Sequence, residues 1–544
     1  MRLKLTCALF LAAGALQAQT PAISAGGVFN TASYAPAGLP GAAIAQGSLF
    51  VIFGKNMGPV ALAVGSLPYT TSLSGTSISV TVNGTTTNPY VVYTSAGQVS
   101  ALLPSNTPVG TGTITITYSG ATSATQPITV AASSVGVFTV NQAGSGPGII
   151  TTANYVVNSL TSAATAGDAN ILWATGLGPV GPSGSEAAGT ATLAALPTTF
   201  QVYVGGVAAK IYGAARSAYP GLDQIVFFVP SGVSGCHVPV VVQTGVTVSN
   251  FVTMAIGTGG VCSDPVGTGL TSTQLTQLQK QGTVSQGYLN LSHSVTAGLT
   301  IGPISLPGTT SDGGTAVFDR YTFQQYTAAT GGVNVTTFGA CSVYFATGTG
   351  GPTDPTTPTP LDAGSAITVT GPNGMKTLTT IPQAPGIYSG TLGSATSPYL
   401  VAGNYTITGP GGKDVGPFST NITLPPTLTW TNAASISNVI RANGQLITWT
   451  GGDPSGSIQI SGYSALISGT SEVVAGFECT VPDTPGQFTI PAPVLLALPA
   501  GTAGTPSGSL SVGAVTATKN FTATGLDLGY LSAISSSSQT VTYQ

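Results

Sequence analysis

Histidine is the side chain that most readily moves a proton near neutral pH, and the chain contains two, His237 and His293. A serine hydrolase would need one of them between a carboxylate and a serine. The sequence has no G-x-S-x-G nucleophile elbow, and its many serines make any triad drawn from the sequence alone meaningless. His237 follows Cys236 in a predicted turn before a strand, where we expect a surface or capping role. His293 shares the parity of Leu289 and Leu291 in an alternating segment, which predicts an ordinary strand side chain.

Carboxylates could act in pairs, since glycoside hydrolysis needs two of them a few ångströms apart. The first acidic residue of the chain is Asp168, and the later ones are dispersed. Examples are Asp312 with Asp319, Asp354 with Asp362, and Glu472 with Glu478. Calcium sites need several carboxylates in one short loop, so a single loop-bound calcium ion at Asp362 or Asp414 is only an alternative. We therefore predict no catalytic residue, no metal site and no cofactor.

Cysteine could supply metal ligands, thiol nucleophiles or disulfides. Four of the five cysteines lie beyond residue 18, at Cys236, Cys262, Cys341 and Cys479, and their spacings match no zinc or C-x-x-C pattern. In an exported protein disulfides are the natural interpretation, and four cysteines allow three pairings. We favour a Cys262–Cys341 bridge, which would fix the start of a third module. Buried free thiols are the alternative.

Aromatic rings could form a flat platform on which a sugar stacks. Trp430 and Trp449 lie beside threonine and glycine near the end of the chain, and they are the candidate ligand-binding residues. The alternative for both is the buried tryptophan of a sandwich core. Exposed, clustered tryptophan and tyrosine would favour carbohydrate binding.

Charged residues are scarce in the whole chain. The 544 residues include 11 Lys and Arg and 14 Asp and Glu, or 5%, and the net charge is -3. A typical soluble domain carries about 25% charged residues. The composition excludes a basic nucleic-acid binder, a charged coiled coil and charge-driven disorder. Between residue 19 and Asp168 the only charged side chain is that of Lys55.

Residues 1–18 have the form of a secretory signal peptide. Arg2 and Lys4 precede a largely apolar run, Leu5–Leu16, and Ala18 supplies the small residue at a cleavage point. No later segment offers about 18 uninterrupted apolar residues, so we expect no transmembrane segment. The predicted location is outside the cell, either secreted or at the cell surface.

An internal repeat is the clearest pattern in the sequence. Gly47–Val60 aligns without gaps with Gly167–Val180, at an offset of 120 residues. Two further matches keep this order at offsets of 122 and 126, namely Val80–Gly84 with Val202–Gly206 and Gln98–Pro104 with Gln224–Pro230. We therefore predict two copies of one module, at residues 26–140 and 150–258. Trp173 matches Phe53 in this alignment, which favours a core position for the tryptophan.

The side-chain period within the copies is two, which is typical of β-strands. Ile78, Val80 and Val82 alternate with polar residues and lead into Asn83-Gly84, a hairpin turn pair. Beyond the repeat, similar alternation predicts a β-rich module at 283–424 and a β-sandwich module at 427–544. Pro425-Pro426 marks the predicted boundary between them.

One convincing helix signal follows the second copy. Thr271 and Gln274 form a capping-box pair, and Gly282 can end the helix. We predict a short helix at about 272–281 within a connector at 270–282. The predicted fold class is all-β: tandem immunoglobulin-like sandwich modules with one short connecting helix.

Several segments together resemble a known family. They are Gly26–Asn30, Ser33–Pro36, Gly47–Val60, Gln98–Pro104 and Trp173–Val180. In this order they resemble the uncharacterised Solibacter-type family of acidobacterial secreted proteins, over about residues 26–258. The resemblance implies a pair of immunoglobulin-like sandwiches of the IPT/TIG kind. It implies no activity and brings no catalytic residues.

The expected function is passive. We expect a secreted or cell-surface structural, adhesive or interaction protein that is not an enzyme, with an unknown protein or glycan as partner and no nucleic acid. An extracellular carbohydrate-binding protein is the alternative. An extracellular hydrolase with its active site in the 283–424 region is the least favoured interpretation.

Overall fold

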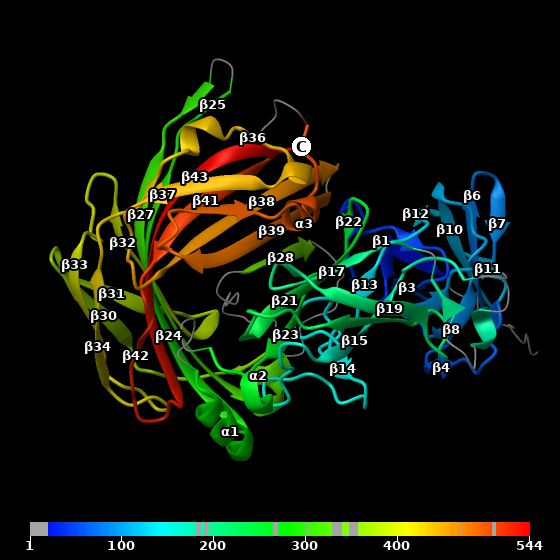
Figure 1. Ribbon diagram of the computed structural model, residues 1–544, viewed down its shortest axis with the longest axis horizontal. Helices are drawn as coiled ribbons and strands as arrows, with labels where there is room; N and C mark the ends of the chain where they lie inside the picture. The colour runs from blue at the N-terminus through cyan, green and yellow to red at the C-terminus, as the bar shows by residue number, and fades with distance from the viewer. Residues whose placement is uncertain are drawn as a thin grey trace, which may run out of the picture.

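The computed structural model describes residues 20–180, 186–189, 194–196, 198–264, 270–301, 304–328, 340–347, 357–468, 471–502 and 507–544. The predicted signal peptide, 1–18, lies outside the described residues. Two sandwiches and a larger β body follow one another along the long axis of the molecule (Figure 1). The first sandwich is blue in that view, the second cyan to green, and the C-terminal body green to red.

The first sandwich forms because its strands are apolar on one face only. In the strand 76–82 the side chains of Ile78, Val80 and Val82 are fully buried between the sheets. Ile114 and Ile116 lie opposite Val80 and Ile78 on the neighbouring strand and are buried with them. One sheet has the order β1 (Ala22–Asn30), β3 (Leu49–Lys55), β9 (Gln98–Leu102), β8 (Tyr90–Thr94), β4 (Ala63–Val64). The other has the order β2 (Ile44–Ala45), β12 (Gln126–Ala131), β10 (Gly110–Tyr118), β6 (Thr76–Val82), β5 (Ser72–Leu73), with β11 (Ala121–Thr122) on β10 and β7 (Thr85–Thr87) on β6.

The second sandwich repeats this strand order. Its first sheet runs β13 (Gly136–Val137), β15 (Ala169–Thr175), β20 (Asp223–Phe228), β19 (Lys210–Arg216), β16 (Ala194–Ala195), with β14 (Ile150–Thr152) on β15. Its second sheet runs β18 (Val207–Ala208), β17 (Gln201–Val204), β21 (Gly235–Thr244), β22 (Thr247–Val248), with β23 (Val252–Ile256) on β21. Strands β3, β9, β8 and β4 thus correspond to β15, β20, β19 and β16. Since β13 already belongs to the second sandwich, that sandwich begins before residue 140, the end expected for the first.

One long sheet spans the whole C-terminal body. Its order is β28 (Ala340–Thr347), β39 (Ser471–Pro482), β38 (Ser457–Ser468), β41 (Gly508–Val515), β43 (Leu528–Tyr543), β24 (Thr283–Thr296), β27 (Thr309–Thr322), β32 (Ala384–Ser394), β31 (Gly374–Ile381), β30 (Ala366–Gly371), β33 (Gly403–Gly409), β34 (Phe418–Leu424). Three short strands pair with strands in the middle of this sheet: β29 (Thr359–Pro360) with β27, and β36 (Asn438–Val439) and β42 (Lys519–Asn520) with β43. Two small sheets complete the body, β25 (Leu299–Ile301) with β26 (Ile304–Leu306), and β35 (Thr429–Trp430) with β37 (Gln445–Thr450) and β40 (Gln487–Ile490).

The predicted boundary at Pro425-Pro426 does not separate two sheets. The last strand, β43, pairs in parallel with β24 from Gln286 to Thr296 and antiparallel with β41. In the opposite direction β28, from the predicted third module, pairs with β39 of the predicted fourth. Strands from 283–424 and strands from 427–544 therefore pair with one another in a single sheet. A proline pair marks a local break in the chain, but it carries no information on pairings between strands that lie far apart in the sequence.

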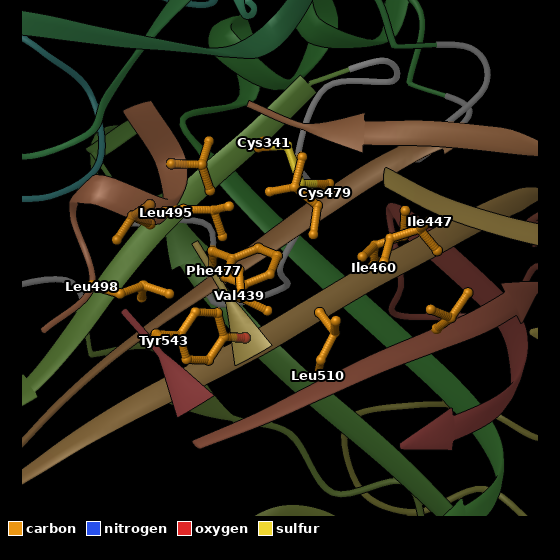
Figure 2. Packing of buried hydrophobic residues seen from close by; sticks show 14 of the residues in the cluster. Cys341, Val439, Ile447, Ile460, Phe477, Cys479, Leu495, Leu498, Leu510 and Tyr543 are labelled. Atoms are coloured by element: carbon orange, nitrogen blue, oxygen red, sulfur yellow. A yellow bond between two sulfur atoms is a disulfide. The ribbon is translucent and has the colours of Figure 1, made fainter. Parts of the chain in front are cut away.

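The C-terminal body has two apolar cores, and β43 contributes to both. Leu531 packs in the core that contains Phe318. Tyr543, at the other end of the same strand, packs in the core that contains Phe477, which Figure 2 shows together with the Cys341–Cys479 disulfide. The full burial of all these side chains means that β43 fastens one half of the body to the other.

The predicted helix at 272–281 is confirmed by α1 (Ser272–Gln281). Thr271 and Gln274 form the complete capping box, and Gly282 ends the helix in the left-handed conformation, at φ 80°. The described residues include two further short helices, α2 (Phe323–Ala328) and α3 (Ala492–Leu496), and the 3-10 turns η1 (Glu186–Ala188), η2 (Thr258–Gly260), η3 (Ala433–Ser435) and η4 (Arg441–Asn443).

Candidate functional site

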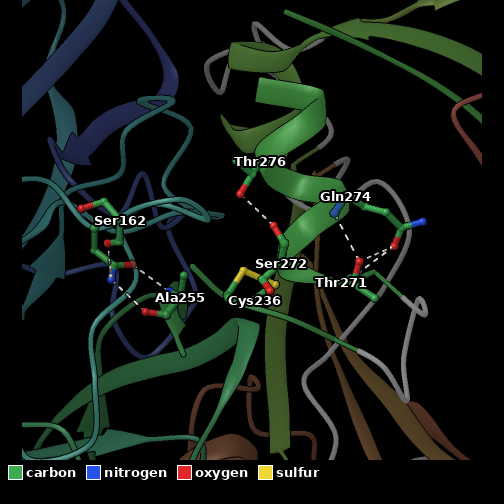
Figure 3. Close-up of a disulfide and its surroundings, with 9 residues drawn as sticks. Ser162, Cys236, Ala255, Thr271, Ser272, Gln274 and Thr276 are labelled. Carbon is green, nitrogen blue, oxygen red and sulfur yellow. Dashed lines mark hydrogen bonds between the residues drawn. A yellow bond between two sulfur atoms is a disulfide. The ribbon is translucent and has the colours of Figure 1, made fainter. Parts of the chain in front are cut away.

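The two disulfides correct the expected cysteine pairing. Cys236 is bonded to Cys262, and Cys341 is bonded to Cys479, so the predicted Cys262–Cys341 bridge is wrong. Cys341 and Cys479 face each other in register on β28 and β39. Cys236 lies at the start of β21, and Cys262 follows β23, the antiparallel neighbour of β21. Sheet register decides both pairings, and cysteine spacing does not reveal it. Figure 3 shows Cys236 and its disulfide beside the start of α1.

His293 forms a buried pair with Asp312. Its Nδ1 lies 2.6 Å from Oδ1 of Asp312, the residue opposite it on β27. The other carboxylate oxygen of Asp312 accepts hydrogen bonds from the backbone N–H groups of Tyr399, at 2.6 Å, and Leu400, at 2.9 Å. The Asp312 side chain is completely buried and that of His293 is 17% exposed. The pair therefore fixes the 399–400 loop to the centre of the long sheet.

The arrangement has the order of a catalytic triad but not its contacts. Ser535 lies opposite His293 on β43, so Asp312, His293 and Ser535 form a row across three neighbouring strands. No hydrogen bond joins His293 to Ser535 within the described part of the chain. The cavity beside them, lined also by Leu291 and Leu400, measures about 30 Å³, which is room for water rather than a substrate. These contacts supply hydrogen-bond partners to the buried carboxylate of Asp312.

A buried ion pair lies where the two sandwiches meet, with the Arg216 side chain close to Gly47 of the first sandwich. Arg216 Nε donates to Asp223 Oδ1, and the Arg216 side chain also donates to the carbonyl of Gly178. Burial raises the pKa of Asp223, while the Arg216 guanidinium and the backbone N–H of Leu177 oppose that rise. Across the same joint the backbone N–H of Ser105 donates to Glu186, at 2.9 Å. The Ser105–Glu186 bond thus crosses between the two modules, whereas the Arg216–Asp223 pair orders the end of the second sandwich that meets the first.

His237 lies inside β21, not in the turn that the sequence suggests. It lines a cavity of about 280 Å³ between the second sandwich and α2, together with Val140, Val157, Met254 and Thr327. Burial lowers the pKa of His237, and the negative charge of Asp264 acts in the opposite direction. The imidazole is therefore held neutral beside the Cys236–Cys262 disulfide.

Trp430 and Trp449, the candidate ligand-binding residues, are core residues. They lie opposite each other on β35 and β37 and are 6% and 3% exposed. The indole N–H of Trp449 donates to Asp483, and that of Trp430 donates to Asn432. These two rings cannot form an exposed platform, because their faces pack in the core around Phe477.

An exposed aromatic pair occurs instead on the second sandwich. Tyr155 is 66% exposed and packs on Trp173, with ring centroids 6.1 Å apart and planes at 36°. Trp173 is half-buried on the outer face of its sheet, so the predicted core position is wrong. Its neighbours Leu172 and Ala174 take the core face. The repeat match to Phe53 identifies equivalent faces, but it does not say which face is inward.

The same aromatic arrangement is present in the first sandwich. Tyr34 packs on Phe53, with ring centroids 6.4 Å apart. Tyr34 and Tyr155 both have left-handed backbone conformations, at φ 51° and 60°. A signal in the sequence could have revealed this pair. Tyr34 and Tyr155 lie about 120 residues apart, and each precedes the repeated strand that carries an aromatic residue, Phe53 or Trp173.

Asp362 and Asp414 organise loops. The backbone N–H of Asp362 donates to the Asp414 carboxylate, and the Asp362 carboxylate accepts from Gly364 and Lys413. Among the described residues, no three His, Cys, Asp or Glu side chains gather closely enough to hold a metal ion. No helix in the described ranges has the length and apolarity needed to cross a membrane.

Comparison with known proteins assigns this chain to no family. No family model and no curated protein matches this chain. Among solved structures, the Bacteroides ovatus mixed-linkage glucan utilization locus protein SGBP-B, in complex with a heptasaccharide, is 11% identical, with 80% of this chain and 78% of that chain covered and a TM-score of 0.13. Domains 5–6 of the S-layer protein SbsC are 14% identical, covering 44% and 98%, at a TM-score of 0.16. Titin Ig tandem domains A164-A165 are 8% identical, covering 39% and 91%, at 0.12.

TM-scores this low carry no argument about this chain. The chain is an all-β protein of tandem immunoglobulin-like sandwiches. The predicted fold class is confirmed by the sheets themselves.

Replacing Asp312 should strongly destabilise the C-terminal body. Asp312→Ala leaves the N–H groups of Tyr399 and Leu400 and the ring of His293 without their acceptor, so we expect a loss of about 3–5 kcal/mol in the free energy of unfolding. Ser311→Ala, at an exposed position on the same strand, is the control, with an expected change within about 0.5 kcal/mol. Urea unfolding followed by tryptophan fluorescence measures both. Equal effects of the two substitutions would contradict the structural role of Asp312.

Stability should fall in mild acid because of His237. Its pKa is lowered in the folded protein, so the unfolded chain binds the extra proton first. In the unfolded chain the pKa of histidine is about 6.5. Above this pH His237 does not reduce the free energy of unfolding. Below it, the free energy of unfolding falls by up to about 1.4 kcal/mol per pH unit. Thermal unfolding at pH 7 and pH 5 should give a smaller difference for His237→Gln than for the unsubstituted protein. An unchanged difference would contradict this role of His237.

Proposed function

We propose that this chain is an extracellular, non-enzymatic scaffold whose rigid β modules present surfaces to a protein or glycan partner. The two disulfides support an oxidising location, because such bonds persist mainly outside the cytosol. The scarcity of charge supports a passive role, since catalysis and electrostatic steering both depend on charged groups.

One observation carries the proposal: the two side-chain pairs of a basic and an acidic group found among the described residues are both buried in structural contacts. Arg216 and Asp223 are buried with Gly178 where the two sandwiches meet. The pair of Asp312 with His293 fastens a loop to the long sheet. None of these groups faces a cavity of substrate size.

The joint between the second sandwich and the C-terminal body is an apolar core of its own. Leu160 of the sandwich, Leu275 and Leu278 of α1, and Leu528 of β43 pack in one cluster with the Cys236–Cys262 disulfide. Because each side chain is nearly fully buried, separating the two bodies would expose the whole cluster to water.

A third contact ties the C-terminal body to both sandwiches at once. Val343 of β28 and Phe477 of β39 belong to the same buried cluster as Leu39 of the first sandwich and Val248 and Phe251 of the second. Three bodies that share one core move as a unit, which suits a scaffold better than a hinged enzyme.

The non-enzymatic proposal is tested with a panel of ester, peptide and glycoside substrates. We expect no turnover above background from the protein containing residues 20–544. His293→Asn distinguishes the one arrangement that resembles a triad from contamination, with His237→Gln as the control substitution. Turnover that His293→Asn abolishes and His237→Gln leaves unchanged would overturn the proposal.

Carbohydrate binding is a second candidate, favoured by the exposed Tyr155–Trp173 pair. Sugar rings stack on such surfaces, and Trp173 is held in place by the hydrogen bond from its indole N–H to Thr151, at 3.0 Å. We expect Tyr155→Ala to weaken binding of any glycan found on an array by about tenfold, or about 1.4 kcal/mol. Tyr212→Ala, at an exposed tyrosine on β19, is the matched control. An array with no binding, or equal losses in both variants, would remove this candidate.

A further inference from the structure

A β-bulge directs His237 into the cavity between the second sandwich and α2. On β21, Cys236 and His237 together lie opposite the single residue Ala255 of β23. The next residue, Val238, is fully buried in the core of the sandwich. Because neighbouring side chains on a strand point to opposite faces, His237 points out of the sandwich, to the side on which Thr327 of α2 lines the same cavity.

Hydrogen bonds hold the walls of this cavity in place. The Asn158 side chain accepts from the backbone N–H of Ala255, at 2.7 Å, and donates to its carbonyl, at 2.8 Å. The side chain of Asn141, the neighbour of Val140, donates to the carbonyl of Ala328 at the end of α2, at 3.1 Å. Since the walls are fixed in advance, little conformational entropy is lost when a ligand enters.

Three polar side chains in the lining have no protein partner. Within the described part of the chain, the imidazole of His237 and the hydroxyls of Ser159 and Thr253 form no hydrogen bond with other residues. Burial lowers the pKa of His237, so its neutral ring donates from one nitrogen and accepts at the other. Each hydroxyl also donates and accepts. The described residues that line the cavity include no Lys, Arg, Asp or Glu, so these groups favour an uncharged ligand.

Aliphatic side chains form much of the remaining lining. Leu160 is buried, whereas Val140 and Val157 are 44% and 43% exposed. The volume of about 280 Å³ lies just below the range of cavities that hold drug-sized ligands, so it suits a single ring. A sugar ring matches this lining, because its hydroxyls can bond to several polar groups while its C–H groups lie on aliphatic side chains. A phenol would bring only one hydroxyl to three such groups.

We propose that this cavity binds one ring of a neutral sugar, either a free monosaccharide or the terminal residue of a glycan. His237, Ser159 and Thr253 bond to its hydroxyls, and Val140 and Val157 contact its C–H groups. The bound ring lies between the second sandwich and α2 of the C-terminal body. The site goes beyond the proposed scaffold function, and neither ring of the exposed Tyr155–Trp173 pair lines it.

The two histidines provide the measurement. Residues 20–544 contain only His237 and His293, so protein with isotope-labelled histidine gives two imidazole signals by nuclear magnetic resonance. The signals are assigned with His237→Gln and His293→Asn. In titrations with glucose, galactose, mannose and N-acetylglucosamine, we expect at least one sugar to shift the His237 signal to saturation. The His293 signal should not move.

Disaccharides that end in the same ring distinguish the two sources of the sugar. Binding of the monosaccharide alone identifies a free sugar as the ligand, and equal binding of the disaccharide identifies the end of a glycan. Either result supports the site.

Filling the cavity tests the location. Val157→Trp places a large ring among the lining residues, so we expect the dissociation constant of the sugar to rise by at least about tenfold. Val246→Trp, at a valine 72% exposed on the β21–β22 hairpin, is the matched control and should leave it unchanged. His237 is present in both variants, so the same signal reports binding, and circular dichroism checks that each variant is folded.

Four outcomes would overturn the proposal: no saturable shift with any sugar, equal shifts of both histidine signals, equal affinities of the two tryptophan variants, or phenol binding more tightly than every sugar. The scaffold function is tested separately by the substrate panel, so turnover there contradicts that function whether or not a sugar binds.

Discussion

The buried contact between successive modules is the constraint on which the rest of the structure depends. A sandwich of this kind has few charges to keep it soluble and few to hold it to a neighbour, since the first module has only Lys55. At the joint, Arg216 and Asp223 are removed from water together, and each finds a partner there. A buried pair of this kind contributes modestly to stability, but the loss of either partner leaves an uncompensated charge. The bonds that cross the joint, from the N–H of Leu49 to Thr175 Oγ1 and from the N–H of Ser105 to Glu186, favour one relative arrangement of the modules.

The C-terminal body is stabilised by a different device. Its final strand, β43, lies between β24 and β41 and is buried at both ends, with Leu531 in one core and Tyr543 in the other. The parallel pairing of β43 with β24 connects residues more than two hundred positions apart. This pairing makes residues 283–544 one unit and also fixes the row in which His293 and Asp312 meet.

Local signals in the sequence predicted local structure well. The capping box at Thr271 gave the helix, and the aligned Gly47–Val60 and Gly167–Val180 segments gave two sandwiches of equal strand order. The sequence did not reveal which strands pair when they lie far apart along the chain. The disulfide of Cys341 with Cys479 depends on which strand pairs with β28, and the face of Trp173 depends on which side of its sheet meets the core. The Asp312–His293 pair has the same origin, since each residue alone is an ordinary member of an alternating strand.

The central claim is that joints built from buried side chains make the chain one rigid body. Spin labels at Val60→Cys, in the first sandwich, and Met375→Cys, in the C-terminal body, test it most directly by pulsed electron paramagnetic resonance, because both positions are exposed and lie in different bodies. A rigid scaffold predicts a single narrow distance distribution between the two labels. A broad distribution, or several separate distances, would contradict it.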